Sequence, residues 1–194
     1  MGTLPISKVE DLGIEVGQVW DDAMAERVAQ AGVYDKALRQ AMNRLNRRAM
    51  SRRDLGRKLH GLGYDEPVRE AVLDRLTELQ FLDDEVYARA LIDATMRRKP
   101  AGPQLLRQKL YQKGIDGSLI ERLVSEATDA VDLAPGAVEL ARKKLRTMQR
   151  VDAETKRRRL YGLLARRGFN PDTISSVMAE LADELSEGGE NPWE

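Results

Sequence analysis

A unit of about fifty residues occurs three times in tandem in this chain, and it limits the possible folds strongly. The copies superimpose when Gly63, Gly114 and Gly168 are aligned. Each copy has leucines eight and four residues before the glycine, an apolar residue and then Asp or Asn after it, and apolar residues nine and ten positions beyond it. Repeats of this length indicate stacked supersecondary units that bury their apolar faces against one another.

The aligned glycine predicts where one helix ends and the next begins. Glycine can adopt the left-handed conformation that terminates a helix, because it has no Cβ to clash. The apolar residue after it can pack back on the preceding helix, while Asp65, Asp116 and Asn170 can accept hydrogen bonds from the free N–H groups of the next helix. Pro67 and Pro171 suit the first turn of that helix. Each copy is therefore predicted to contain a pair of helices joined by a short turn.

A further helix precedes each pair, because apolar residues recur there at the helical period. Ser51, Gly102 with Pro103, and Asp152 mark the starts of the middle helices. We expect an all-α fold of three tandem three-helix repeats, with nine helices in residues 34–187, forming an elongated curved array with a short N-terminal arm. The apolar residues expected on the first helices are Leu38, Ala41, Met42 and Leu45, then Val86, Tyr87, Ala90, Leu91 and Ala94, then Val138, Ala141, Leu145 and Met148.

The two ends of the chain differ from the repeats. The segment LGIEVGQVW has two glycines between its apolar residues and predicts a turn or irregular segment, followed by a short helix from about residue 21 to 30. The expected domains are an N-terminal arm at 1–33, helical repeats at 34–82, 83–130 and 131–187, and an acidic tail at 188–194.

Composition and charge indicate a cytoplasmic protein that binds a polyanion or an acidic surface. The 194 residues include 42% hydrophobic and 33% charged residues, no cysteine, no long apolar run and no signal-peptide pattern at the start. The net charge of zero conceals segregation, because residues 37–182 carry 29 basic and 20 acidic side chains between acidic ends. Such a basic body attracts polyanions, whereas acidic tails either restrain binding or are simply solvated.

The sequence contains no recognisable catalytic or cofactor motif. It has no glycine-rich phosphate loop, no GxSxG, no HExxH and no cluster of Cys or His. The single histidine, His60, cannot form a metal site alone and is expected to be solvated. Acidic pairs such as Asp83 and Asp84 lie at a predicted helix start, where they favour the helix dipole. We therefore expect no enzyme activity, no catalytic residues, no metal and no cofactor.

Clusters of arginine and lysine recur around the first two helices of each repeat and are the candidate partner or DNA contacts. If the repeats stack, these clusters follow one surface, as expected for a protein that binds along an extended partner. The alternative is a solvated face with weak ion pairs. The candidates are Arg44, Arg47, Arg48, Arg52, Arg53, Arg57, Lys58, Arg97, Arg98, Lys99, Arg142, Lys143, Arg146, Arg157, Arg158, Arg166 and Arg167.

One segment resembles a known family. LTELQFLDDEVYARALI, residues 76–92, resembles the signature that joins the first two repeats of the RecX family of bacterial recombination regulators, and SRRDLGRKLHGLGY and RRRLYGLLARRGF are similar to its first and third repeat motifs. The resemblance covers about residues 34 to 182 and assigns structural positions at the joint to Leu82, Asp83, Asp84, Tyr87 and Ala88. LGIEVGQVWDD resembles the end of an additional N-terminal region of some members.

The resemblance implies a partner and a function. Members of that family bind the RecA recombinase, lie in the groove of its filament on DNA, and inhibit strand exchange, ATP hydrolysis and coprotease activity. It thus implies a regulator of recombination, DNA repair and the SOS response, with DNA contacted within or alongside the filament. We further expect a monomer that binds no membrane.

Two alternatives stay open at this stage. The helix pairs could bind nucleic acid directly as helix-turn-helix units, although DEPVREAVLDRLTEL mixes acidic with basic residues and offers few side chains suited to base edges. The chain could instead be a helical scaffold for an unrelated partner, with its acidic ends as docking segments.

Overall fold

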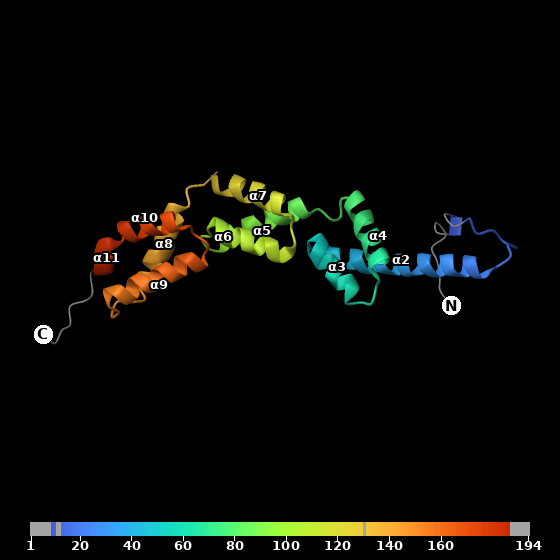
Figure 1. Cartoon of the computed structure of the whole chain (residues 1–194), viewed down its shortest axis with the longest axis horizontal. Helices are drawn as coiled ribbons and strands as arrows, with labels where there is room; N and C mark the ends of the chain where they lie inside the picture. Colours follow the sequence, from blue (N-terminus) through green and yellow to red (C-terminus); the bar gives the residue numbers. More distant parts are fainter. Residues whose placement is uncertain (1–8, 11–12, 130, 187–194) are drawn as a thin grey trace. The chain divides into compact units, whose positions relative to one another are not determined.

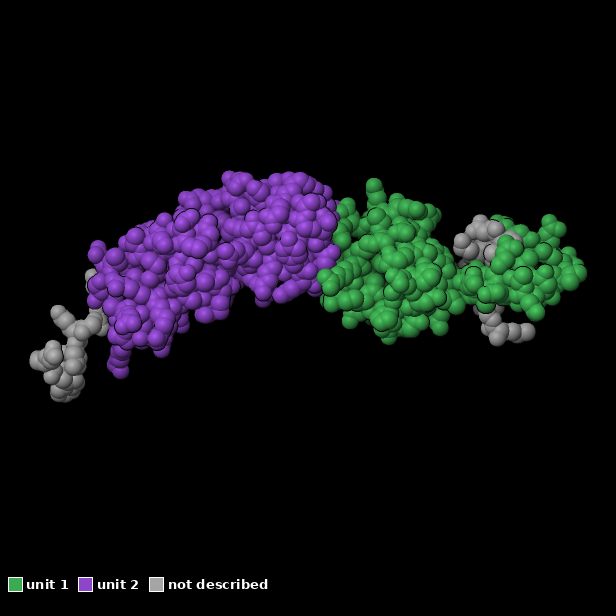
Figure 2. Space-filling model, viewed as in Figure 1, with its two compact units in different colours: residues 1–84 green, residues 85–194 purple. Residues whose placement is uncertain are grey.

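A computed structural model describes residues 9–10, 13–129 and 131–186 of the chain. The beginning of the predicted arm and the acidic tail at 188–194 lie outside these residues. The described part contains α-helices and no strand, which confirms the all-α prediction. It divides into two units, residues 1–84 and residues 85–194 (Figure 2). Among the described helices, none combines the length and the apolar character needed to cross a membrane.

The first unit contains α2 (Asp22–Arg47), α3 (Arg52–His60) and α4 (Glu66–Glu78), labelled in Figure 1. Helix α2 packs on α3 and α4, and α3 packs on α4. The buried side chains form one core. They are Ala37, Ala41, Met50, Leu55, Leu59, Val72, Leu73, Leu76 and Leu82.

Helix α2 corrects the prediction for the N-terminal segment. It begins where expected, with Asp21 accepting a hydrogen bond from Met24 N, but it continues to Arg47 instead of ending near residue 30. The predicted boundary at residue 33 therefore lies inside a helix. A glycine in a helix interior costs only about 1 kcal/mol relative to alanine, so Gly32 does not terminate α2.

The second unit contains two repeats, each with its own core (Figure 1). The second repeat comprises α5 (Asp84–Arg98), α6 (Pro103–Lys113) and α7 (Gly117–Asp129), with Asp84 itself assigned to the first unit. The third comprises α8 (Ala134–Leu145), α9 (Ala153–Arg166), α10 (Pro171–Glu180) and α11 (Ala182–Ser186). Helix α11 was not predicted, and it adds Leu185 to the third core.

The helix ends have the geometry that the repeat predicted. Gly63, Gly114 and Gly168 have φ values of 87°, 73° and 79°, which lie in the left-handed region. The carboxylate of Asp65 accepts from Val68 N at 3.1 Å, and the side chain of Asn170 accepts from Thr173 N at 2.7 Å. The residue after each glycine is buried or half-buried. The aligned positions therefore form equivalent turns between helices.

The buried face of α5 differs from the prediction. The buried residues are Ala88, Ile92 and Thr95, whereas Val86 is 64% exposed, and Ala90 and Ala94 are exposed as well. Tyr87 and Leu91 pack partly against the second core, as expected. The buried residues of α5 follow the i, i+4, i+7 spacing of a helix face. They lie one to two residues later in the sequence than the predicted buried residues.

The second and third repeats meet at two helix ends. The N–H of Gly102, before α6, donates to Arg167 O at 2.8 Å, and Gln104 N donates to Gly168 O at 3.1 Å, both after α9. The free donors at the start of one helix thereby satisfy the free acceptors at the end of the other. A Cβ at Gly102 would lie 2.2 Å from Gly168 O, so this approach requires glycine.

Candidate binding surface

The candidate cations of the first repeat divide into paired and exposed groups. Arg52 makes ion pairs with Glu70 and Asp74 of α4, with N–O distances of 2.6 and 2.7 Å, and Arg57 pairs with the buried Asp54. Arg52 therefore joins α3 to α4, whereas the pair of Arg57 lies within α3. The nitrogen Nε of Arg44 is buried and has no hydrogen-bond partner among the described residues. The exposed candidates, which have no ion pair with a described residue, are Arg47, Arg48, Arg53 and Lys58.

The electrostatics of Arg52 agree with a structural role. Burial disfavours its charged form, but the hydrogen bonds to Asp74 and Glu70 outweigh burial and raise the pKa of the guanidinium. Its backbone N–H also donates to the Asp84 carboxylate at 2.7 Å, so Asp84 provides a cap for the first turn of α3. Burial raises the pKa of Asp84, and the hydrogen bond from Arg52 N partly offsets that rise. The second aspartate of the Leu-Asp-Asp signature therefore stabilises the first repeat.

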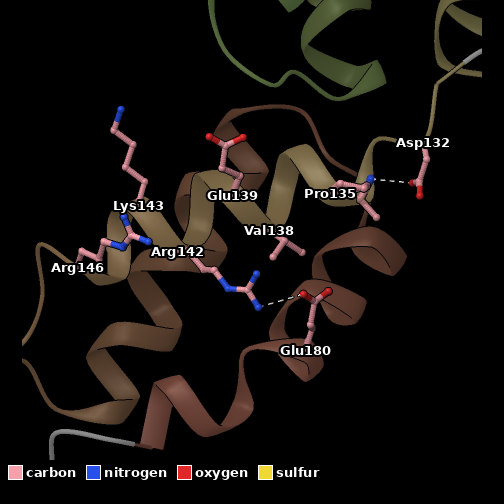
Figure 3. Close-up of a pocket in the computed structure, with 9 residues that line it drawn as sticks. Asp132, Pro135, Val138, Glu139, Arg142, Lys143, Arg146 and Glu180 are labelled. Carbon is pink, nitrogen blue, oxygen red and sulfur yellow. Dashed lines mark hydrogen bonds and ion pairs between the residues drawn. The ribbon is translucent and has the colours of Figure 1, made fainter.

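The third repeat shows the same division. Arg142 on α8 reaches Glu180 of α10 at 3.2 Å and Glu184 of α11 at 2.9 Å, and the bond to Glu184 contributes most to its raised pKa. Figure 3 shows Arg142 turned toward Glu180, while Lys143 points away from that carboxylate. The exposed candidates without an ion pair to a described residue are Lys143, Arg146, Arg157, Arg158 and Arg166.

The second repeat neutralises most of its central cations internally. Arg89 and Arg122 both pair with Glu85 and Glu126, and Arg107 pairs with Glu121 at 2.9 Å. Among the described cations of this repeat, the exposed ones without such a pair lie at and just after the C-terminal end of α5, namely Arg97, Arg98 and Lys99. These cations lie at a helix C-terminus, where positive charge is favoured by the helix dipole.

Arg167 has a role that the sequence did not predict. Its Nε donates to Pro100 O and its Nη2 to Lys99 O, both at 2.8 Å, so its side chain joins the third repeat to the segment between α5 and α6. Burial lowers the pKa of this guanidinium, and no carboxylate among the described residues opposes the effect. Arg167 is thus a partly buried cation whose hydrogen bonds to described residues go to neutral carbonyls.

Two residues near these clusters have surroundings that the sequence did not predict. Lys109 belongs to the basic cluster of the second repeat, and its Nζ lies 3.3 Å from the hydroxyl of the buried Thr95. Lys156 is 3% exposed and belongs to the interior of the third repeat. The sequence signal of the contact between Lys109 and Thr95 is that Thr95 is a polar residue in an otherwise apolar helix stripe.

The described residues include no group of three or more His, Cys, Asp or Glu side chains that could hold a metal ion. His60 is exposed, with its Nδ1 2.6 Å from Nη1 of Arg69. The arrangement therefore offers cationic surface for binding, presented by short helices on well-packed cores.

These features define a class of protein in which three small helical domains follow one another and present exposed basic side chains. Residues 37–76, 83–123 and 137–178 match the first, second and third three-helix domains of RecX, respectively. The chain belongs to the RecX family, which confirms the resemblance noted in residues 76–92.

Known relatives agree over most of the chain. It is 36% identical over 146 residues to the regulatory protein RecX of Prosthecochloris aestuarii, covering 75% of this chain and 93% of the relative. It is 35% identical over 172 residues to that of Mycolicibacterium vanbaalenii, covering 84% and 91%. The shared name describes regulation and not catalysis, in agreement with the expectation that the protein is not an enzyme.

Solved structures agree as well. A crystal structure of regulatory protein RecX has a TM-score of 0.79 and 26% identity, covering 92% of this chain and 85% of that one. RecX from Lactobacillus salivarius has a TM-score of 0.70 and 25% identity, covering 78% and 98%.

Proposed function

We propose that this protein binds the filament that the RecA recombinase forms on DNA and inhibits its strand exchange, ATP hydrolysis and coprotease activity. The observation that carries the proposal is that each of the three repeats matches its counterpart in the RecX family, in the same order. The protein would act in the cytoplasm as a monomer, without a cofactor, by occupying a surface and not by catalysis.

The exposed side chains support a macromolecular partner. The first and third repeats each present four or more cations without an ion pair to a described residue. Phe81, Tyr111 and Tyr161 are each more than half exposed, and tyrosine is enriched among the residues that dominate the binding energy of protein interfaces. A filament of protein on DNA offers both an anionic backbone and protein surfaces.

The decisive experiment adds the protein to a preformed RecA filament on single-stranded DNA and measures ATP hydrolysis and strand exchange. We expect both rates to fall when the protein is well below one copy per RecA subunit, because one bound regulator spans or blocks several subunits. An unchanged rate at equimolar protein would contradict the proposal.

Direct binding of nucleic acid is the second candidate function, and the basic clusters support it. It is distinguished by measuring affinity for DNA without recombinase over a range of salt concentrations. A steep loss of DNA affinity with salt, together with no effect on a preformed filament, would favour this candidate, because neutralised phosphates release their counterions on binding.

A further inference from the structure

A cavity lies between the second and third repeats, within the second unit. Its volume is about 310 Å³, at the lower end of the range for small-ligand sites. The C-terminal half of α5 supplies one wall, with the apolar side chain of Leu91 and the buried hydroxyl-bearing Thr95. The remaining lining includes Arg98, Lys99, Lys109 and Arg167.

The charge of this cavity is its unusual property. Four cations line it, from the end of α5, from α6 and from the residue after α9, and no carboxylate is among the described lining residues. The cavity in Figure 3 is larger, about 700 Å³, but balances Arg142, Lys143 and Arg146 against Asp132, Glu139 and Glu180. Like charges that converge repel one another, and a bound counter-charge relieves that repulsion.

The stability of the fold accounts for the position of some of these four cations but not of all of them. Arg167 is held by its bonds to the carbonyls of Lys99 and Pro100, and Arg98 lies where the dipole of α5 favours a cation. Neither reason applies to Lys109, which could extend into solvent from α6 but lies with its Nζ 3.3 Å from Thr95 Oγ1. That contact directs a cation into a cavity that is already positive.

We propose that this cavity, the inter-repeat cavity, binds a phosphate group. A phosphate carries more charge and more acceptor oxygens than a carboxylate, and can therefore accept hydrogen bonds from several cations at once. Arginine suits it through its planar fork of donors and lysine as a point charge. The phosphate comes either from the backbone of a nucleic acid or from free phosphate.

If the bound phosphate belongs to DNA, the inference rests on the proposed function, because it then names the DNA group that the inter-repeat cavity contacts. It is nevertheless tested separately, because phosphate binding is measured without recombinase. If the unaltered protein inhibits the filament but does not bind phosphate, the phosphate site alone is contradicted. If it binds phosphate but does not inhibit the filament, the proposed function alone is contradicted.

The test uses the full chain and three probes, namely inorganic phosphate, a short single-stranded oligonucleotide and poly-glutamate. Phosphate binding is followed by changes in the backbone amide resonances of residues 95–109, and oligonucleotide affinity by fluorescence anisotropy. The variant combines Arg98→Gln with Lys109→Gln and leaves Arg167 in place. The matched control combines Lys144→Gln with Arg150→Gln, which removes two exposed charges of the same unit outside the cavity.

We expect phosphate to perturb these resonances. The variant should bind phosphate at least about tenfold more weakly than the control, because the loss of even one of its two charged hydrogen bonds predicts a change of that size. If the variant also binds the oligonucleotide more weakly by the same factor, and inorganic phosphate competes with the oligonucleotide for the unaltered protein, the source is the nucleic-acid backbone. Unchanged oligonucleotide affinity identifies free phosphate. Resonances that do not respond, equal behaviour of variant and control, or weakening only toward poly-glutamate would each overturn the proposal.

Discussion

Gly168 meets two requirements at one position. Its φ of 79° lies in the left-handed region, and a Cβ there would lie 2.1 Å from Leu105 N, in the first turn of α6. Gly63 has the equivalent position in the first repeat and a φ of 87°, but a Cβ there would meet nothing within 4 Å. The two glycines therefore share a backbone conformation and differ in whether another helix lies against them.

That difference predicts unequal effects of alanine. Gly63→Ala should cost about 1 kcal/mol, from strain in the left-handed region alone. Gly168→Ala should cost about 3 kcal/mol, because overpacking adds to that strain. Denaturant unfolding followed by circular dichroism measures both. Hydrogen exchange of the Gly102 and Gln104 amides should accelerate in Gly168→Ala only. Equal losses for the two variants would contradict the close approach between α6 and the end of α9.

Local residue patterns predicted these turns, but not the contacts between distant residues. The Gly-apolar-Asp/Asn sequence acts within a few residues, so the left-handed glycines and the caps at Asp65 and Asn170 were predictable. Arg167 bonds to carbonyls 67 and 68 residues earlier, and nothing in its neighbouring sequence separates it from Arg166. A cluster of arginines therefore indicates charge, while the packing of the repeats decides which arginine is structural.

At the scale of elements, α5 and α7 are joined by an ion-pair network on the surface of the second repeat. Glu85 on α5 accepts hydrogen bonds from Arg122 on α7 and from Arg89 one turn later on its own helix. These two arginines, Arg122 first, lower the pKa of Glu85 to about 2. Exposed pairs are individually weak, and a network that links two helices has more effect than its single pairs.

The lowered pKa of Glu85 predicts an acid-sensitive contribution to stability. It is fully present above the ordinary pKa of 4.5 and is lost as pH falls through about 2, because in that window the unfolded chain binds a proton that the folded chain does not. Glu85→Gln should therefore unfold with a denaturant midpoint that changes less over this window than that of the wild type. In Glu139→Gln, which removes an exposed carboxylate of α8, the denaturant midpoint should change with pH as much as it does in the wild type. Parallel curves for all three proteins would contradict the network.

The apolar pattern of α5 was not sufficient to predict which face of the helix is buried. Alanine, valine and leucine occur on several faces of α5, so the set that includes Val86, Ala90 and Ala94 looked as regular as the true stripe at Ala88, Ile92 and Thr95. Thr95 lies in the buried stripe although it is polar. Because threonine is mostly found exposed, a search for apolar residues in the sequence does not include it. Helices with a single apolar face, such as α9 with Leu160 and Leu164, were placed correctly.

At the scale of the whole molecule, the three repeats use their cations differently. The second repeat, residues 83–130, has 8 basic and 8 acidic side chains and so carries no net charge, and its Arg89, Arg107 and Arg122 are paired within the repeat. The first and third repeats leave more of their cations exposed. The second repeat therefore suits a spacer between two more basic repeats, apart from the cations of the inter-repeat cavity.

Matched variants test this division of roles, with three positive charges removed in each. The first-repeat variant is Arg47→Gln, Arg48→Gln and Arg53→Gln. The third-repeat variant is Arg157→Gln, Arg158→Gln and Arg166→Gln. The second-repeat control is Arg89→Gln, Arg107→Gln and Arg122→Gln. Since exposed cations gain a partner only on binding, the first two variants should each need about tenfold more protein to inhibit the filament ATPase, with unchanged unfolding midpoints. The control loses pairs that already exist, so it should inhibit like the wild type and unfold at a lower denaturant concentration. If the control lost as much inhibition as the other two, net charge rather than its distribution among the repeats would govern binding.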